Sequence, residues 1–172
     1  TMRLLPSPAL TASLLAASAL PRAPTPRLAV WDTFDHTYDN VQYSAKIQSA
    51  SPLTGSAKCP PIVCIPPLGV GITRRFYEPL HREWAALGAP GELHTPELCG
   101  NGDSKPKRRR FYTPELWADQ LLDYCANEVK RPCILVVQGG LLPVALEMWK
   151  KGGSSCIAGV SFVAPPALRF FK

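Results

Sequence analysis

Short apolar runs alternate with longer amphipathic stretches along most of this chain, and this alternation constrains its fold more than any other feature. The apolar runs are residues 62–65, 133–137 and 156–166, and a further short strand is expected within residues 91–104. Parallel strands are joined by crossovers of a dozen or more residues, which are usually helices. The order of these stretches therefore predicts an α/β fold with a mostly parallel sheet and helices on both faces.

The first expected helix lies within residues 73–88, where four large apolar side chains share one helical face. Pro79 interrupts this stretch and predicts a kink or a late start. Before it, residues 37–49 alternate in polarity, which predicts one exposed strand. The shared face consists of Phe76, Leu80, Trp84 and Leu87.

The second and third expected helices lie at residues 113–129 and 143–150. Thr113 has the residue type of an N-cap, and Pro114 suits the first turn. The Gly-Gly-Ser-Ser segment after the third helix is expected to end it. The core-facing stripe of the second helix is Leu116, Gln120, Leu121 and Tyr124.

Composition and charge are those of one globular domain. The chain has 172 residues, of which 46% are hydrophobic and 19% are charged. The net charge is +6, and much of it comes from the first 27 residues and from the basic run at residues 105–110. That run would attract phosphate, but a solvated surface loop explains it as well. A nucleic-acid partner is therefore not favoured.

Six cysteines are present, and no two of them have the C-x-x-C spacing. Cys64, Cys133 and Cys156 lie in or beside apolar runs, where a free thiol behaves as a small hydrophobic group. Buried structural thiols are the favoured interpretation, with disulfide or metal roles as alternatives. Gly69 and Gly71 lack the third glycine and the acidic partner of a dinucleotide loop, so no cofactor is expected. The three histidines form no ligand pattern with the cysteines, so no metal site is assigned.

Residues 1–29 contain no acidic residue and combine a basic start, a short apolar stretch and a region rich in Pro, Arg and Ala. This pattern predicts a targeting or transit-like segment, disordered or removed, with a disordered tail as the alternative. A plastid is the favoured destination, and a mitochondrion or secretion are the alternatives. The apolar stretch is too short for a transmembrane span. The domain is expected to occupy residues 30–172.

Four segments in sequence order resemble the α/β-hydrolase family. They are IVCIPPLGVG from Ile62, ELCGNGDS from Glu97, ILVVQGGLLPVALEM from Ile134 and IAGVSFVAPPALR from Ile157. The resemblance covers roughly residues 41–169 and is closest to the AB hydrolase-1-like proteins of the cyanobacterial and plastid type. It implies the N-terminal half of that fold, truncated after the strand that follows the nucleophile turn.

In this family a strand-to-helix turn, called the nucleophile elbow, carries the nucleophile at its apex. The resemblance places Gly139 at that apex, between Gln138 and Gly140, so the elbow is degenerate and no catalytic residue is assigned. Backbone N–H groups of Leu68 and Gly140 are expected at the positions of the oxyanion donors, because any residue except proline supplies this group. Val137 and Leu141 replace the two flanking glycines of the family pattern.

The family also places its catalytic acid and histidine after the elbow, and this sequence has no histidine after His94. His81 and His94 are expected to be structural, and Glu97 is expected to cap the glycine turn that follows it. Two functions stay open. One is a non-catalytic binding or assembly subunit in an organelle, with a protein partner covering the edge of the last strand. The other is a fragment of an ester or lipid hydrolase whose acid and histidine lie beyond residue 172.

Overall fold

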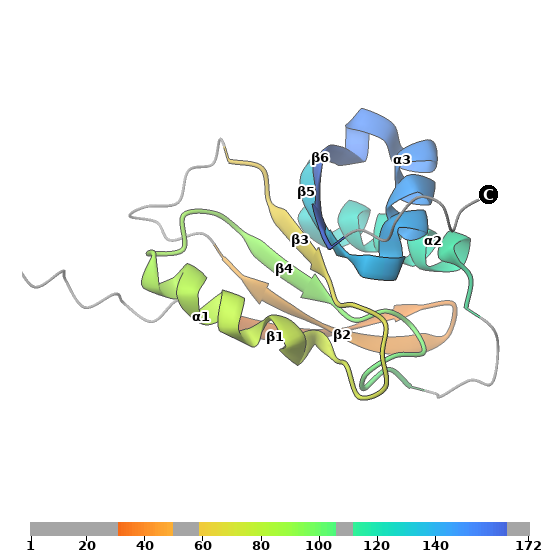
Figure 1. The fold of residues 1–172 in the computed structure, drawn as a ribbon, viewed down its shortest axis with the longest axis horizontal. Helices are drawn as coiled ribbons and strands as arrows, with labels where there is room; N and C mark the ends of the chain where they lie inside the picture. Colours follow the sequence, from red (N-terminus) through yellow and green to blue (C-terminus); the bar gives the residue numbers. More distant parts are fainter. Residues whose placement is uncertain (1–30, 50–58, 106–111, 165–172) are drawn as a thin grey trace, which may run out of the picture.

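The computed structural model describes residues 31–49, 59–105 and 112–164. The expected targeting segment, most of the basic run and the last eight residues lie outside these ranges. Within them, a six-stranded sheet has the order β1-β2-β4-β3-β5-β6 (Figure 1). The strands are β1 (Trp31–Tyr38), β2 (Val41–Gln48), β3 (Ile62–Ile65), β4 (Leu93–Pro96), β5 (Cys133–Gln138) and β6 (Ile157–Val163).

The sheet is mostly parallel, as the alternation predicts. Strands β4, β3, β5 and β6 run in one direction, and β2 is antiparallel to both β1 and β4. Each parallel connection contains a helix: α1 (Glu78–Ala86), α2 (Pro114–Tyr124) or α3 (Leu142–Cys156). The carboxyl ends of β3, β4 and β5 therefore meet at one edge of the sheet.

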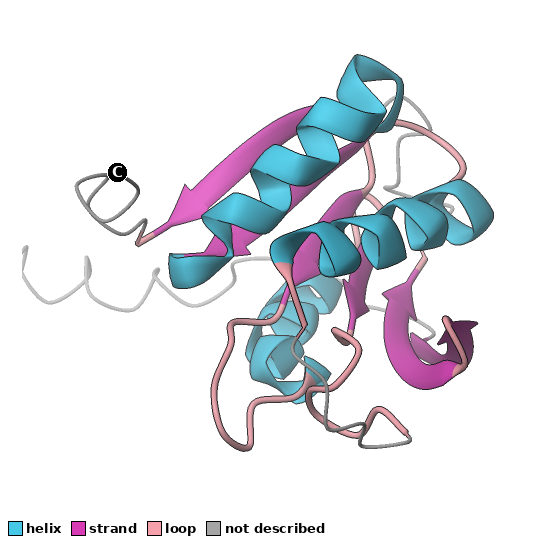
Figure 2. Ribbon diagram, turned by 90° about the vertical axis from the view of Figure 1, so that its right-hand side faces the viewer, coloured by secondary structure: helices cyan, strands magenta, loops and turns pink. Residues whose placement is uncertain are grey.

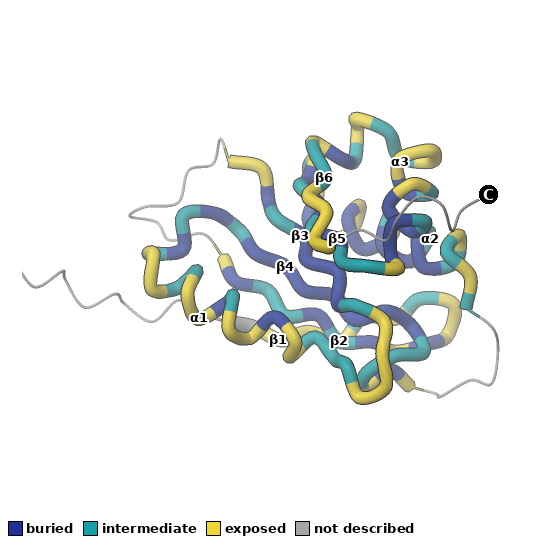
Figure 3. The backbone as a smooth tube through the Cα atoms, viewed as in Figure 1, coloured by how far each residue is buried: buried dark blue, intermediate teal, exposed yellow. Residues whose placement is uncertain are grey.

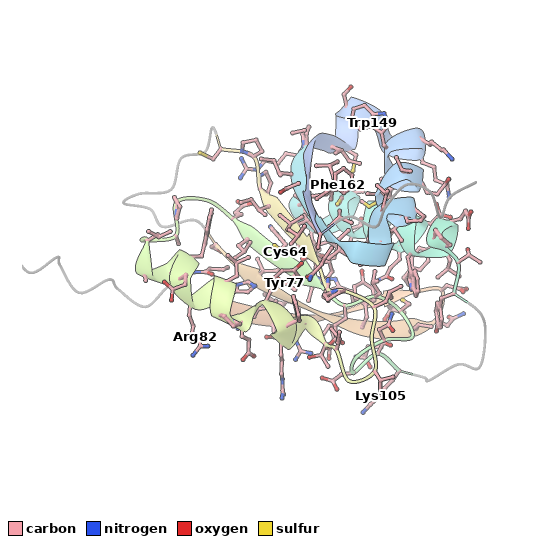
Figure 4. All side chains as sticks on the ribbon, viewed as in Figure 1. Cys64, Tyr77, Arg82, Lys105, Trp149 and Phe162 are labelled. Atoms are coloured by element: carbon pink, nitrogen blue, oxygen red, sulfur yellow. The ribbon has the colours of Figure 1, made fainter. Side chains whose placement is uncertain are left out.

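The helices cover both faces of the sheet. Helices α2 and α3 pack on one face of the sheet and α1 on the other (Figure 2). Strand β3 displays the division, because Val63 and Ile65 belong to the core under α2 and α3, while Cys64 belongs to the smaller core under α1. Tyr77 closes this smaller core beside Cys64, and its hydroxyl donates to the Ile65 carbonyl at 3.3 Å (Figure 4).

The prediction of one exposed strand over residues 37–49 is wrong. A β-hairpin occupies this region, with Asp39 and Asn40 at the turn in left-handed conformations (φ 49° and 57°). Asp and Asn are the non-glycine residues that tolerate this conformation best, so they permit a tight two-residue connection. Alternate side chains of β2 are buried, since its inner face packs on the main core (Figure 3).

Pro79 delays the first helix, as expected: α1 starts at Glu78 after a 3₁₀ turn at Arg74–Tyr77. The predicted face is wrong in part, because Phe76 and Leu87 are exposed. Tyr77 and His81 are buried in their place, which rotates the buried face by about one residue.

The other two helices match the sequence in part. Thr113 caps α2 by accepting a hydrogen bond from the Leu116 N–H at 3.3 Å. Helix α3 is broken at Gly153 (φ 54°, ψ −152°), within the Gly-Gly-Ser-Ser segment that was expected to end it, and a further short turn of helix follows to Cys156. The apolar run after it forms β6, and most side chains of this strand are exposed because it lies at an edge of the sheet.

Candidate functional site

The carboxyl ends of the parallel strands place three loops at one edge of the sheet, where α/β proteins hold their sites. These loops follow β3, β4 and β5. The register pairs Ile65 of β3 with Val137 of β5, so the first and third loops leave the sheet side by side. This edge is the candidate site.

The turn after β5 has the backbone shape of an elbow. Gln138 is extended (φ −116°, ψ 136°), Gly139 turns to φ 57°, and α3 begins after a 3₁₀ turn at Gly139–Leu141. An ideal Cβ built on Gly139 meets no heavy atom within 4 Å, and the same is true of Gly140. The apex therefore faces open space and presents only backbone.

The second expected backbone donor lies on the neighbouring loop. Leu68 follows the end of β3 by three residues, and Gly140 follows Val137, the partner of Ile65, by the same number. The Leu68 residue is 43% exposed, so its part of the loop is accessible to a ligand. The Gly140 N–H lies at the start of a helix and the Leu68 N–H lies in the loop beside it. Backbone N–H groups of this kind suit a carbonyl or carboxylate oxygen.

Glu97, directly after β4, is the most connected side chain at this edge. Its residue is 1% exposed, and Oε1 accepts from the Arg74 backbone N–H at 3.1 Å and from Arg74 Nη1 at 3.3 Å. Oε2 accepts from the Asp103 backbone N–H at 3.1 Å. The carboxylate thus ties the loop after β3 to the glycine turn after β4. The expected capping role is observed, and the bond to Arg74 is an addition that the sequence did not indicate.

The glycine turn is built around this carboxylate. An ideal Cβ on Gly102 would lie 2.4 Å from Glu97 Oε1, so no larger residue fits beside the carboxylate. Ser104 Oγ accepts from the Gly100 N–H at 2.8 Å. Gln120 of α2 donates to the Glu97 carbonyl at 2.7 Å and accepts from the Cys99 N–H at 2.9 Å. Gln120, the polar residue of the α2 stripe, therefore links the helix to this turn through buried hydrogen bonds.

His81 and His94 are both held in buried hydrogen bonds. His81 Nδ1 lies 3.1 Å from Gln48 Oε1, and its Nε2 lies 2.9 Å from Thr95 Oγ1. Burial lowers the pKa of His81 to about 4. His94 Nδ1 lies 3.0 Å from the Tyr124 hydroxyl, and burial lowers its pKa as well.

His94 lies far along the sheet from the apex of the elbow. His94 is in register with Val63 at the start of β3, and Val63 is in turn in register with Leu135. Gly139 follows Leu135 by four residues, which is about 13 Å along a strand. Both histidines therefore stabilise the fold where they lie.

No family model matches this chain, and no curated protein sequence does. Solved structures do match its fold. A haloalkane dehalogenase from Agrobacterium tumefaciens C58 is 19% identical with a TM-score of 0.61, over 78% of this chain and 41% of that protein. The thioesterase domain from the curacin biosynthetic pathway is 17% identical with a TM-score of 0.61, over 80% and 47%. A membrane phospholipase A is 17% identical with a TM-score of 0.60, over 81% and 41%.

The chain has the α/β-hydrolase fold. It spans less than half the length of these three proteins. Gly139 lies in the turn after β5, and Leu68 lies in the loop after β3.

Within the described ranges, no group of three His, Cys, Asp or Glu side chains is arranged to hold a metal ion. None of the helices in those ranges has the length and apolar character needed to cross a bilayer. A cluster of three thiols, in which Cys125 is central, was not anticipated from the sequence because its members are far apart in the chain.

Proposed function

We propose that this α/β-hydrolase-fold chain is a non-catalytic binding or assembly subunit. The observation that supports this is Gly139, which occupies the apex of the elbow at φ 57° with open space where a nucleophile would project. Covalent hydrolysis needs an oxygen or sulfur nucleophile there and a histidine to accept its proton. Gly139 supplies no such atom.

The ligand class follows from what the edge still offers. Backbone N–H groups of Gly140 and Leu68 can donate to the oxygen of an ester or carboxylic acid without any side chain. The proposed ligand is therefore a small ester, or a lipid with a carboxyl or ester group. It is bound and released unchanged.

Two measurements on the same preparation test this proposal. Turnover of p-nitrophenyl butyrate and labelling by a fluorophosphonate probe are expected to be absent. Titration with butyrate is expected to shift the amide NMR signals of Leu68 and Gly140 more than those of the opposite edge. Fluorophosphonate labelling within the described ranges, or butyrate shifts confined to other regions, would refute the proposal.

A matched pair of variants isolates the backbone donor. Leu68→Pro removes the N–H and extends the preceding Pro66-Pro67 run, whereas Leu68→Ala keeps the N–H and removes the side chain. Butyrate binding is expected to weaken in Leu68→Pro and to persist in Leu68→Ala. Equal loss in both variants would show that the leucine side chain, and not the N–H group, binds the ligand.

A second candidate is an ester or lipid hydrolase of which this chain is a part. The short coverage of the solved structures favours it, since the matched proteins extend well beyond the matched region. Ester turnover by a longer natural product, abolished when one histidine outside these 172 residues is replaced, would establish it. Gly139 would then require a nucleophile from another position.

The setting proposed for either function is an organelle, most simply a plastid, on the basis of residues 1–29. A fluorescent fusion of these residues tests this, and a diffuse cytosolic signal would contradict it.

A protein partner over β6 is proposed for the assembly role, because Phe162 and Val163 are 43% and 45% exposed on this edge strand (Figure 4). Light scattering of the purified chain would show a stable monomer if this idea is wrong.

A further inference from the structure

Three free thiols meet at the edge of the sheet opposite the elbow. Cys125 begins a π-type turn after α2, Cys133 begins β5, and Cys156 ends α3. The sulfur atoms of Cys125 and Cys133 are 3.9 Å apart. Cys125 and Cys156 line the same pocket, so Cys125 is shared between the buried pair and the pocket.

The members of the cluster differ in exposure. Cys125 and Cys133 are buried, whereas Cys156 is partly exposed. Cys156 and Cys125 line an open pocket of about 550 Å³. Cys156 is therefore the more accessible of the two pocket thiols.

The rim of this pocket carries positive charge. Lys130, Arg131 and Lys151 line it, and Glu92 and Asp119 form ion pairs with Arg131 and Lys151. No acidic side chain is among the lining residues of the pocket. Because cations attract anions and stabilise thiolates, the pocket favours a negatively charged thiol reagent over a neutral one.

Hydrogen bonding distinguishes the two pocket thiols. The hydrogen bond from Cys125 lowers the pKa of Cys156 to about 7. The pKa of Cys125 is raised, first by its hydrogen bond with Cys133. Cys156 is also the more exposed of the two, so it is the thiol placed to attack an incoming disulfide.

The backbone around the pocket departs from regular helix at three points. Cys125 begins the π-type turn at Cys125–Val129, Lys130 ends this turn in a left-handed conformation (φ 60°), and Gly153 breaks α3 three residues before Cys156. Turns of the π type recur at functional sites. Gly153 separates the segment that carries Cys156 from the regular part of α3.

We propose that this pocket is a thiol–disulfide exchange site for an anionic low-molecular-weight disulfide, with Cys156 as the attacking group and Cys125 as the resolving group. The Cys156 thiolate attacks one sulfur of the reagent, whose S–S bond breaks and releases one thiolate. Cys125 then attacks the Cys156 sulfur and gives its proton to the second leaving thiolate. Two protein thiols are oxidised to one disulfide, and the reagent disulfide is reduced to two thiols.

The test is a time course of the chain with oxidised glutathione, followed by intact mass and peptide mapping. A mass gain of one glutathionyl group at Cys156 is expected first, and then a Cys125–Cys156 disulfide with the loss of two hydrogen atoms. Cys59 is the internal control, because it is exposed and does not line the pocket. At pH 7, Cys156 is expected to react several-fold faster than Cys59, because cationic side chains line its pocket and attract the anionic disulfide.

Three variants separate the roles. Cys156→Ser abolishes the fast reaction, Cys125→Ala stops at the mixed disulfide, and Cys133→Ala behaves as the parent does. Lys130→Gln slows the reaction with oxidised glutathione several-fold but leaves that with neutral hydroxyethyl disulfide unchanged. The proposal is overturned if the unaltered chain reacts as fast at Cys59, or if peptide mapping finds a Cys125–Cys133 disulfide. These outcomes are independent of ligand binding at the elbow.

Discussion

Replacing Glu97 by Gln is the sharpest test of how the candidate site is held together. The buried carboxylate accepts two backbone N–H bonds, from Arg74 and Asp103, and one bond from the Arg74 guanidinium. An amide has the same shape but only one acceptor oxygen, so its NH₂ group must face one of these donors. A buried N–H group then loses its partner and meets another donor.

The magnitude follows from burial. A hydrogen bond to a charged group contributes about 1.5–3 kcal/mol, and an unsatisfied buried donor costs about 1–3 kcal/mol. We expect Glu97→Gln to lower the free energy of unfolding by about 2 kcal/mol, because Arg74 retains its ion pair with Asp103. For a chain of this size, this corresponds to a fall in Tm of about 4–8 °C.

Asp103→Asn is the matched control. Asp103 Oδ2 lies 3.3 Å from the same Arg74 Nη1 as Glu97 Oε1 does, but the Asp103 side chain is 57% exposed. An exposed ion pair contributes about 0–1 kcal/mol. Urea unfolding of both variants, read by circular dichroism, measures the difference. Equal losses in the two variants would refute the reasoning, because burial and the backbone bonds would then contribute nothing.

Three further perturbations have definite expected outcomes. Gly100→Ala places a Cβ 2.1 Å from the Tyr112 ring at φ 87°, and we expect it to lower the free energy of unfolding in urea by about 2–4 kcal/mol. Gly71→Ala is the control, because Gly71 has φ 76° but nothing within 4 Å of its Cβ position, and we expect it to lower the same quantity by only about 1 kcal/mol. Burial lowers the pKa of His81 to about 4, below its value in the unfolded chain. The unfolded state therefore binds the proton more tightly, and stability present above pH ~6.5 is lost as the pH falls toward 4, whereas a His81→Gln variant shows a flatter pH profile. Gly139→Ser has room for its hydroxyl and is expected to cost about 1 kcal/mol from φ 57° without producing ester turnover; turnover in this variant would reveal a proton acceptor near the apex.

Much of the fold was predictable because its signals are local. The apolar run at Ile62–Ile65 and the cap at Thr113 match the structure, since both depend on residues within one or two turns of each other. The hairpin was missed because Asp39 and Asn40 fit an alternating pattern as well as they fit a turn. The buried face of α1 differs from the expected one because His81, which has two buried polar partners, is part of it, whereas Phe76 and Leu87 are not.

The candidate site, like the fold, was predictable from the sequence only in part. The elbow at Gly139 was recognisable from a strand, two glycines and a helix that are consecutive in the chain. The bond from Arg74 to Glu97 joins residues 23 positions apart, and no pattern in the sequence pairs them. The thiol cluster joins three separate elements, and no two of its cysteines are close enough in sequence to be read as a motif.

The sequence by itself determined the order of strands and helices, and it determined that the apex of the elbow has no side chain. Both are properties of contiguous residues, for which backbone preference and polarity spacing are sufficient. Only the tertiary structure decided which loops share an edge, which carboxylate holds them, and which thiols meet at the opposite edge. These depend on strand register and on burial, because the strength of a hydrogen bond or a thiol's pKa is set by neighbours that the chain brings together only when it folds.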